Sequence, residues 1–325
     1  MNQKNNKAMN HIEYNQIIAV DVAKNELVTY DGNRLGKIAN KPGSFEKLLA
    51  DVNADTSELL VVCEATGSYE RPLVNWLQQR DIAVHIANPA RVRAFAKGKG
   101  IQLKNDPVDA KVLMLYAIEN KVVASRVPTD TERQITALLD RRSHLSRELT
   151  REKNRLEKEP DYTSEFIVKS IEFIKEQISQ IDEQIKQLSE QDKQLKENCD
   201  LFSSIKGVGH LTAITVLTYM PEIATVSRNQ AVALAGLAPY DRDTGTVKGR
   251  RFIQGGRAKI RRCLYMAAVS AARFNPVIRD YVARLIARGK PFKCAIVAAM
   301  RKLIIHMHSQ LKLKLNQIEK NAICA

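Results

Sequence analysis

The stretch IIAVDV at residues 17–22 is a short apolar run that carries one carboxylate, Asp21, near its end. A second run, LLVVCE at residues 59–64, has the same form and ends on Glu64. Short apolar runs rich in branched residues are typical of buried β-strands. If the two strands are neighbours, Asp21 and Glu64 lie side by side at one sheet edge, where a cation would offset their repulsion. Either acid alone could also be an ordinary strand-end residue that points to solvent.

Around these two runs, residues 15–128 alternate apolar and amphipathic stretches, which indicates an α/β domain. Residues 27–30 are the expected hairpin partner of 17–22, and the turn sequence Asp31-Gly32-Asn33 predicts that the first strands are antiparallel neighbours. Three strands, a helix and then alternating strands and helices is the order of a ribonuclease-H-like mixed sheet, although other α/β folds share parts of it. The expected strands are 17–22, 27–30, 35–40, 59–63 and 82–86. Three helices are expected, one that begins after Pro42 and two that cover 69–79 and 107–119.

The sequence NDPVDA at residues 105–110 predicts the start of that last helix. Asp106 precedes Pro107 as an N-cap would, and Asp109 complements the helix dipole, so capping alone explains both acids. Their spacing of three residues nevertheless places both on one face of the helix. A few carboxylates together with substrate phosphate are how proteins hold Mg²⁺. Asp21, Glu64, Asp106 and Asp109 are therefore candidate ligands for Mg²⁺, with Mn²⁺ as an alternative ion.

Residues 129–199 change to charged, glycine-free sequence with apolar residues at heptad spacing, which predicts a coiled coil. Pro160 should break the helix, so its two arms either form a hairpin or pair with another subunit. A solvated spacer is the alternative. The later arm carries Ile167, Ile171, Ile174, Ile178, Ile181, Ile185, Leu188 and Leu195, and the earlier arm carries Ile135, Leu138, Leu145, Leu149 and Leu156.

Residues 200–325 are helical and strongly basic, with helices expected at 259–272 and 293–315. The segment IKGVG at 205–209 resembles a helix-hairpin-helix turn, whose amides can bind a phosphate, but it could also be a turn between core helices. The loop-rich segment 240–262 is dense in cations, which suits phosphate binding, although a basic solvated surface is the ordinary explanation. The candidate nucleic-acid contacts are Lys206, Gly207, Gly209, Arg242, Lys248, Arg250, Arg251, Arg257 and Arg261.

The composition agrees with a nucleic-acid partner. The 325 residues include 51 Lys and Arg against 36 Asp and Glu, a formal net charge of +15, which points to a polyanion. No apolar run approaches the roughly 20 residues that span a bilayer, and the five scattered cysteines form no disulfide or zinc pattern, so we expect a cytoplasmic protein. The expected domains are a disordered tail at 1–14, an α/β domain at 15–128, a coiled coil at 129–199 and a mostly helical basic domain at 200–325.

The acids and their contexts match a known pattern. Asp21, Glu64, Asp106 and Asp109 resemble the DEDD set of the insertion-sequence one-ten transposases and Piv-type DNA invertases, whose N-terminal domain resembles the RuvC Holliday-junction resolvase. The motifs AVDVAK at 19–24, CEATGSY at 63–69, NP at 88–89 and DPVDA at 106–110 fall in that family's order. The resemblance covers nearly the whole chain. It implies a RuvC-like catalytic domain, double-stranded DNA as substrate and strand exchange of an insertion sequence.

The resemblance also implies a nucleophile in the C-terminal half. The family places a serine in a Ser-Gly pair shortly after Gly-Leu-x-Pro, and here GLAP at 236–239 is followed by Thr244-Gly245. Threonine keeps the hydroxyl that attacks a phosphate, while its β-branch restricts the rotamer and crowds the attack. Thr246 is the nearest other hydroxyl. The family further implies a transient covalent link to DNA, a homo-oligomer, either dimer or tetramer, and guidance by an element-encoded noncoding RNA.

Two other functions fit the same residues. One is a RuvC-like, metal-dependent junction nuclease that activates water and forms no covalent link. The other is a non-catalytic DNA-binding protein that uses the coiled coil and the basic domain for assembly. Trapping of protein on DNA through Thr244 would separate the recombinase from both, and metal-dependent cleavage would separate the nuclease from the assembly protein.

Overall fold

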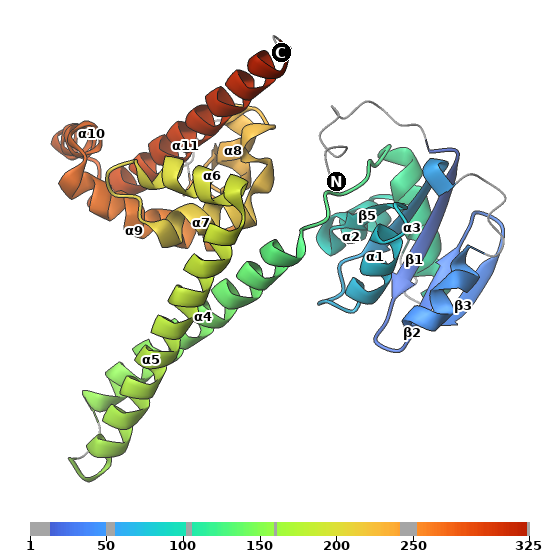
Figure 1. Ribbon diagram of the computed structural model, residues 1–325, viewed down its shortest axis with the longest axis horizontal. Coiled ribbons are helices and arrows are strands. Elements are labelled where there is room, and N and C mark those ends of the chain that lie inside the picture. Colours follow the sequence, from blue (N-terminus) through green and yellow to red (C-terminus); the bar gives the residue numbers. More distant parts are fainter. Residues whose placement is uncertain (1–13, 50–55, 102–105, 159–160, 241–251, 324–325) are drawn as a thin grey trace. The chain divides into compact units, whose positions relative to one another are not determined.

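A computed structural model describes residues 14–49, 56–101, 106–158, 161–240 and 252–323. The chain divides into two compact units, residues 1–127 and 128–325 (Figure 1). The first unit is built on a five-stranded sheet, and the second consists almost entirely of helices. No helix in the described ranges is long and apolar enough to cross a membrane.

The sheet of the first unit is mixed, with strand order β3-β2-β1-β4-β5. β1 pairs with β2 and β2 with β3 in antiparallel fashion, whereas β1 with β4 and β4 with β5 are parallel. The predicted hairpin and all five predicted strands are confirmed. Their bounds are β1 Gln16–Val22, β2 Glu26–Tyr30, β3 Leu35–Ala39, β4 Leu59–Glu64 and β5 Ala83–Ala87.

Helices cover both faces of this sheet. On one face, the 3-10 helix η1 (Pro42–Leu48) and α1 (Arg71–Gln78) pack against Val20 and Val61, with Phe45 and Trp76 in edge contact. On the other face, α2 (Pro89–Gly98) and α3 (Asp106–Glu119) pack against the alternate strand residues. The sequence did not predict α2, because a ten-residue helix that buries only Val92 completely has little periodicity to recognise.

The second unit begins with a helical hairpin. α4 (Asp130–Leu156) starts at a capping box formed by Thr129 and Glu132, and α5 (Asp161–Gln191) runs back beside it (Figure 1). The two arms bury their apolar seams, and the guanidinium of Arg142 crosses between them to Asp182 at 3.0 Å. The two predicted arms therefore form a helical hairpin within one chain, one of the two arrangements that the sequence left open. Its buried seam residues are Ile135, Leu139, Leu145, Ile167, Ile171, Ile181 and Ile185.

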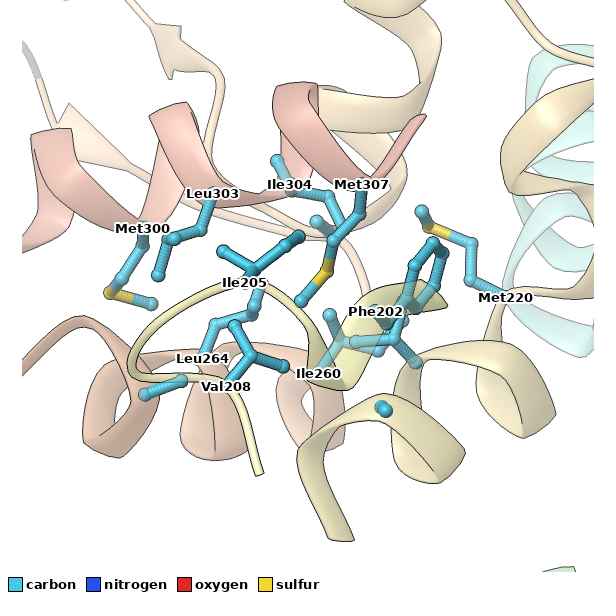
Figure 2. Packing of buried hydrophobic residues seen from close by; sticks show 14 of the residues in the cluster. Phe202, Ile205, Val208, Met220, Ile260, Leu264, Met300, Leu303, Ile304 and Met307 are labelled. Atoms are coloured by element: carbon cyan, nitrogen blue, oxygen red, sulfur yellow. The ribbon is translucent and has the colours of Figure 1, made fainter. Parts of the chain in front are cut away.

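The rest of the second unit is a helical bundle with one large core (Figure 2). Phe202, Ile205, Ile260 and Leu264 meet the buried face of the last helix there. A short antiparallel pair, β6 and β7, precedes the C-terminal helices and was not predicted. The elements are α6 Lys193–Ser203, α7 His210–Tyr219, η3 Pro221–Ala224, α8 Arg228–Leu234, β6 Pro239–Tyr240, β7 Phe252–Ile253, α9 Ala258–Phe274, α10 Pro276–Ala287 and α11 Phe292–Ile323.

Candidate active site

Asp21 and Glu64 lie at the ends of two neighbouring parallel strands. Val20 of β1 is in register with Cys63 of β4, so the two acids follow one residue later on adjacent strands. Both are partly buried. Because side chains alternate along a strand, Asp21 is on the same face as Ala19, and Glu64 is on the same face as Val62. That face is the one covered by α3.

Helix α3 brings the second pair of acids to the same edge. Its last turn contacts the middle of β4 through Ala117, and Glu119 at its end pairs with Lys99. Its first turn, with Asp106 and Asp109, consequently points toward the ends of β1 and β4. Asp109 is partly buried and lies one turn before Leu113, which packs on the sheet. The side chain of Asp106 is outside the described part of the chain.

The donor chemistry at this edge fits a hard divalent cation. Two strand-end carboxylates and one helical carboxylate share one edge and face of the sheet, and oxygen is the ligand that Mg²⁺ prefers. Two further oxygen atoms at this edge, Oδ1 of Asn40 and Oγ1 of Thr66, are buried without a described hydrogen-bond partner. Within the described ranges, no three His, Cys, Asp or Glu side chains come close enough to hold an ion. The types of donor at this edge suit a divalent cation, but the described carboxylates are not arranged around one in this structure.

The loop after β4 is held in a fixed conformation next to Glu64. The carboxylate of Glu70 accepts hydrogen bonds from the amides of Thr66 (3.1 Å) and Ser68 (3.0 Å). Gly67 and Ser68 have left-handed φ values of 68° and 95°, and Ser68 is strained there because it has a Cβ. Asn40 donates to the carbonyl oxygens of Ala23 (3.0 Å) and Tyr69 (2.9 Å). These contacts tie the turn after β1 to the loop after β4, and no motif in the sequence predicted them.

Cys63 adjoins Glu64 but does not belong to the candidate ligand set. Its side chain packs with Val20 and Val61 on the opposite face of the sheet. Burial, with a smaller contribution from the charge of Glu70, raises the pKa of the Cys63 thiol to about 12. A thiol that stays protonated is neither a metal ligand nor a nucleophile at neutral pH.

In the second unit, the turn between α6 and α7 was predicted to bind phosphate. Lys206 is exposed there. Gly207 has φ 98°, and a Cβ at this position would collide with the backbone of Ala271 in α9. Gly209 is the N-cap of α7, makes no side-chain cap and has open space around it. Packing accounts for Gly207, whereas Gly209 leaves the first amides of α7 without a side-chain partner.

Two of the arginines predicted to contact DNA also contact their own unit, and their contact with DNA stays a prediction. The guanidinium of Arg257 forms an ion pair with Glu222, and its amide donates to the carbonyl oxygen of Leu234 (2.8 Å). Arg261 donates through Nη1 to the carbonyl oxygen of Gly255. A Cβ on Gly236 would collide with both that oxygen and Arg261. The contacts of Gly236 with Gly255 and Arg261 hold the segment before β6 against the residues after β7.

The remaining predicted residues cannot be placed. Thr244 and the candidate DNA contacts Arg242, Lys248, Arg250 and Arg251 lie outside the described residues. The described flanks nevertheless fix where their segment starts and ends, because Tyr240 of β6 pairs with Phe252 of β7.

Comparisons with known proteins give this geometry a class. A DEDD-type family profile described as a transposase matches residues 18–159, and a profile described as "Transposase IS116/IS110/IS902 family" matches residues 199–283. The chain is 31% identical over 299 residues to a pilin gene-inverting protein of Moraxella lacunata, covering 88% of this chain and 92% of the relative. The corresponding protein of Moraxella bovis is 30% identical over the same coverage. An uncharacterized protein of insertion element IS110 from Streptomyces coelicolor is 28% identical over 114 residues, which is 34% of this chain and 28% of the relative.

The class is that of DNA recombinases of the transposase and invertase type, which are enzymes. More particularly, the chain belongs to the IS110 family of transposases, as the resemblance of the sequence motifs had indicated.

Proposed function

We propose that the protein exchanges DNA strands with a RuvC-like catalytic domain in which Asp21, Glu64, Asp106 and Asp109 bind Mg²⁺ or Mn²⁺. The strand order β3-β2-β1-β4-β5, with an acid at the end of each of two central strands, supports a ribonuclease-H-like fold. The observation that carries the proposal is the placement of Asp21 and Glu64 on adjacent parallel strands, on the face where α3 delivers Asp109.

The acids supply charge and position in this mechanism. A divalent ion, when bound, neutralises phosphate charge and orients the attacking oxygen. Asp21 and Glu64 sit on central strands, and Asn40 and Glu70 restrain the loops beside them, so the backbone that carries the two carboxylates is held in place. Partial burial strengthens their interaction with a cation relative to fully exposed carboxylates.

Thr244 is the proposed nucleophile. Its hydroxyl oxygen attacks a DNA phosphorus and forms a new phosphoester bond, while the bond from that phosphorus to one strand oxygen breaks. The hydroxyl proton is lost and the leaving strand oxygen takes up a proton, so charge and atoms balance. The reverse attack by a different strand end completes the exchange and frees Thr244.

The wider setting is proposed from the family. The chain acts on double-stranded DNA, is guided by a noncoding RNA of its element, works as a dimer or tetramer and is cytoplasmic. Inversion of a DNA segment, which the names of the two Moraxella relatives describe, is one outcome of such an exchange. In this proposal, the coiled coil at 129–199 and the domain at 200–325 have separate functions. Light scattering of the full chain with nucleic acid measures the mass of the oligomer and so tests its assembly.

The test uses Thr244→Ala, Thr244→Ser and Asp21→Asn in strand-exchange assays on synthetic duplexes with the matching guide RNA. Covalent adducts are scored on a denaturing gel. We expect no adduct and no exchange from Thr244→Ala, retained or higher activity from Thr244→Ser, and loss of both from Asp21→Asn. Cleavage by Thr244→Ala without an adduct would instead identify a water-using junction nuclease, and metal-independent binding alone would identify an assembly protein.

A further inference from the structure

Helix α2 presents a cationic face that the proposed mechanism has not used. Its inner side packs against α3 through Val92 and Phe95. Its outer residues Arg91, Arg93 and Lys97 are exposed. Residues 88–100 contain four Lys or Arg and no Asp or Glu, so the helix has no acid of its own to balance them.

Among the residues that the structure describes, some cations of the unit are neutralised by an acid, but these three are not. Lys99 pairs with Glu119 at 2.7 Å, and elsewhere Lys37 pairs with Glu26 and Arg80 with Glu46. Arg91, Arg93 and Lys97 form no ion pair with any residue in the described part of the chain. Three like charges on one short helix repel one another and raise the free energy of the unit unless a polyanion faces them.

The position of α2 next to the acidic edge of the sheet indicates which polyanion would face its cations. Ala87, the last residue of β5, is in register with Glu64, and Asn88 caps α2 directly after it by accepting a hydrogen bond from the amide of Ala90 (2.9 Å). α2 and α3 run in the same direction, because Lys99 and Glu119 at their ends pair with each other. The helix therefore starts at the edge where the acids gather and leads away from it.

We propose that α2 binds the backbone of the DNA strand that flanks the phosphate held at the acidic edge, with Arg93 and Lys97 as its principal phosphate contacts. Four residues separate them, which is about 6 Å along a helix and close to the rise of two nucleotides in a strand, about 3.4 Å each. A strand that enters the acidic edge carries its next phosphates past this face. The inference rests on the proposed function, which puts a DNA phosphate at Asp21 and Glu64.

The salt dependence of DNA binding tests the contacts. Each phosphate contact contributes about 0.9 to the slope of log affinity against log salt concentration. For the full chain on a 30-base-pair duplex, Arg93→Gln with Lys97→Gln should make that slope shallower by about 1.8. The loss of affinity should be large at low salt and shrink as salt rises. Arg93→Lys with Lys97→Arg should restore the slope.

A matched control removes two charges at the opposite end of the same sheet. Arg34 follows β2 and Lys121 follows α3, both are exposed, and Arg34→Gln with Lys121→Gln should leave the slope unchanged. An unchanged slope in the α2 double variant, or an equal change in the control, would overturn the proposal. So would a loss on duplex RNA without a loss on DNA. Strand exchange that survives Asp21→Asn would instead overturn the proposed function, which the binding slopes do not measure.

Discussion

Gly207 and Gly209 stand two residues apart in one turn, yet the structure requires them for different reasons. Gly207 has φ 98° and lies against the backbone of Ala271, so both its conformation and its surroundings exclude a side chain. Gly209 has φ −90° and ψ 167°, an extended conformation that any residue adopts, with open space around it. The motif predicted one role for both glycines, because Ala271 is far away in sequence.

Replacement of Gly207 by alanine should therefore cost stability. The left-handed conformation alone costs about 1–3 kcal/mol for a residue with a Cβ, and the collision with Ala271 adds to this. We expect Gly207→Ala to lower the free energy of unfolding of the second unit by at least that amount in chemical denaturation. Gly209→Ser is the control and should be neutral or stabilising, since serine is a better N-cap. Equal stability of the two variants would contradict this assignment.

At the scale of elements, the ion pair between Arg257 and Glu222 joins the N-cap of α9 to η3. It also offers a variant that leaves every cation in place. Glu222→Gln removes the partner of Arg257 and no cation, so a slower reaction with unchanged DNA affinity would indicate that the start of α9 is misplaced and that no DNA contact is lost.

We expect Glu222→Gln to slow formation of the covalent adduct while DNA affinity stays the same. A misplacement of about 1 Å in a reacting group can cost on the order of 100-fold in rate. Single-turnover gels give the rate, and a binding titration gives the affinity. Glu190→Gln, an exposed change on α5, is the control. If Arg257 contacts DNA instead, Glu222→Gln would leave the rate unaltered or strengthen binding.

The hairpin of α4 and α5 depends on a seam that is closed within one chain. Ile185 is 1% exposed in that seam, while its neighbour Gln184 is exposed. Ile185→Lys should lower the free energy of unfolding by about 3 kcal/mol or more, because it removes apolar burial and forces a charge out of the interface. Gln184→Lys should change it by less than about 0.5 kcal/mol. Circular dichroism during denaturation measures both, and equal effects would show that the seam is not a tight interface.

At the scale of the whole molecule, the two units have separate hydrophobic cores, so each can respond to a ligand by itself. The four proposed metal ligands all belong to the first unit, so a cation that binds them should act on that unit alone. A ligand that binds only the folded state raises its stability by about 2.7 kcal/mol at 100 times its Kd.

Mg²⁺ or Mn²⁺ should therefore raise the melting temperature of the first unit by a few degrees and leave that of the second unit unchanged. Asp21→Asn and Glu64→Gln should each remove the increase. Asp81→Asn, at the opposite end of the sheet from the acids, should keep it. Differential scanning calorimetry with and without roughly ten millimolar metal makes the comparison. No shift in the unchanged chain would count against the metal site.

Much of the first unit could be predicted from the sequence, because its strands are local and strongly patterned. The runs at 17–22 and 59–64 predicted β1 and β4, the Asp31-Gly32-Asn33 turn lies between the antiparallel strands β2 and β3, and the heptads predicted the helices α4 and α5. Asp21 and Glu64 were identified for the same reason, since each is the one carboxylate in an apolar run of six residues.

Only the tertiary structure decided which of these features meet. The alternation of Asp21 and Glu64 toward α3, the closed seam of the hairpin and the cationic face of α2 beside the acids all depend on contacts between distant segments. Arg257 and Arg261 show the limit clearly, because the sequence indicated only their charge, while the fold adds Glu222 and the carbonyl oxygen of Gly255 as partners within the chain. Local pattern fixes the backbone of an element, but the partner of a long charged side chain depends on what packing brings within its reach.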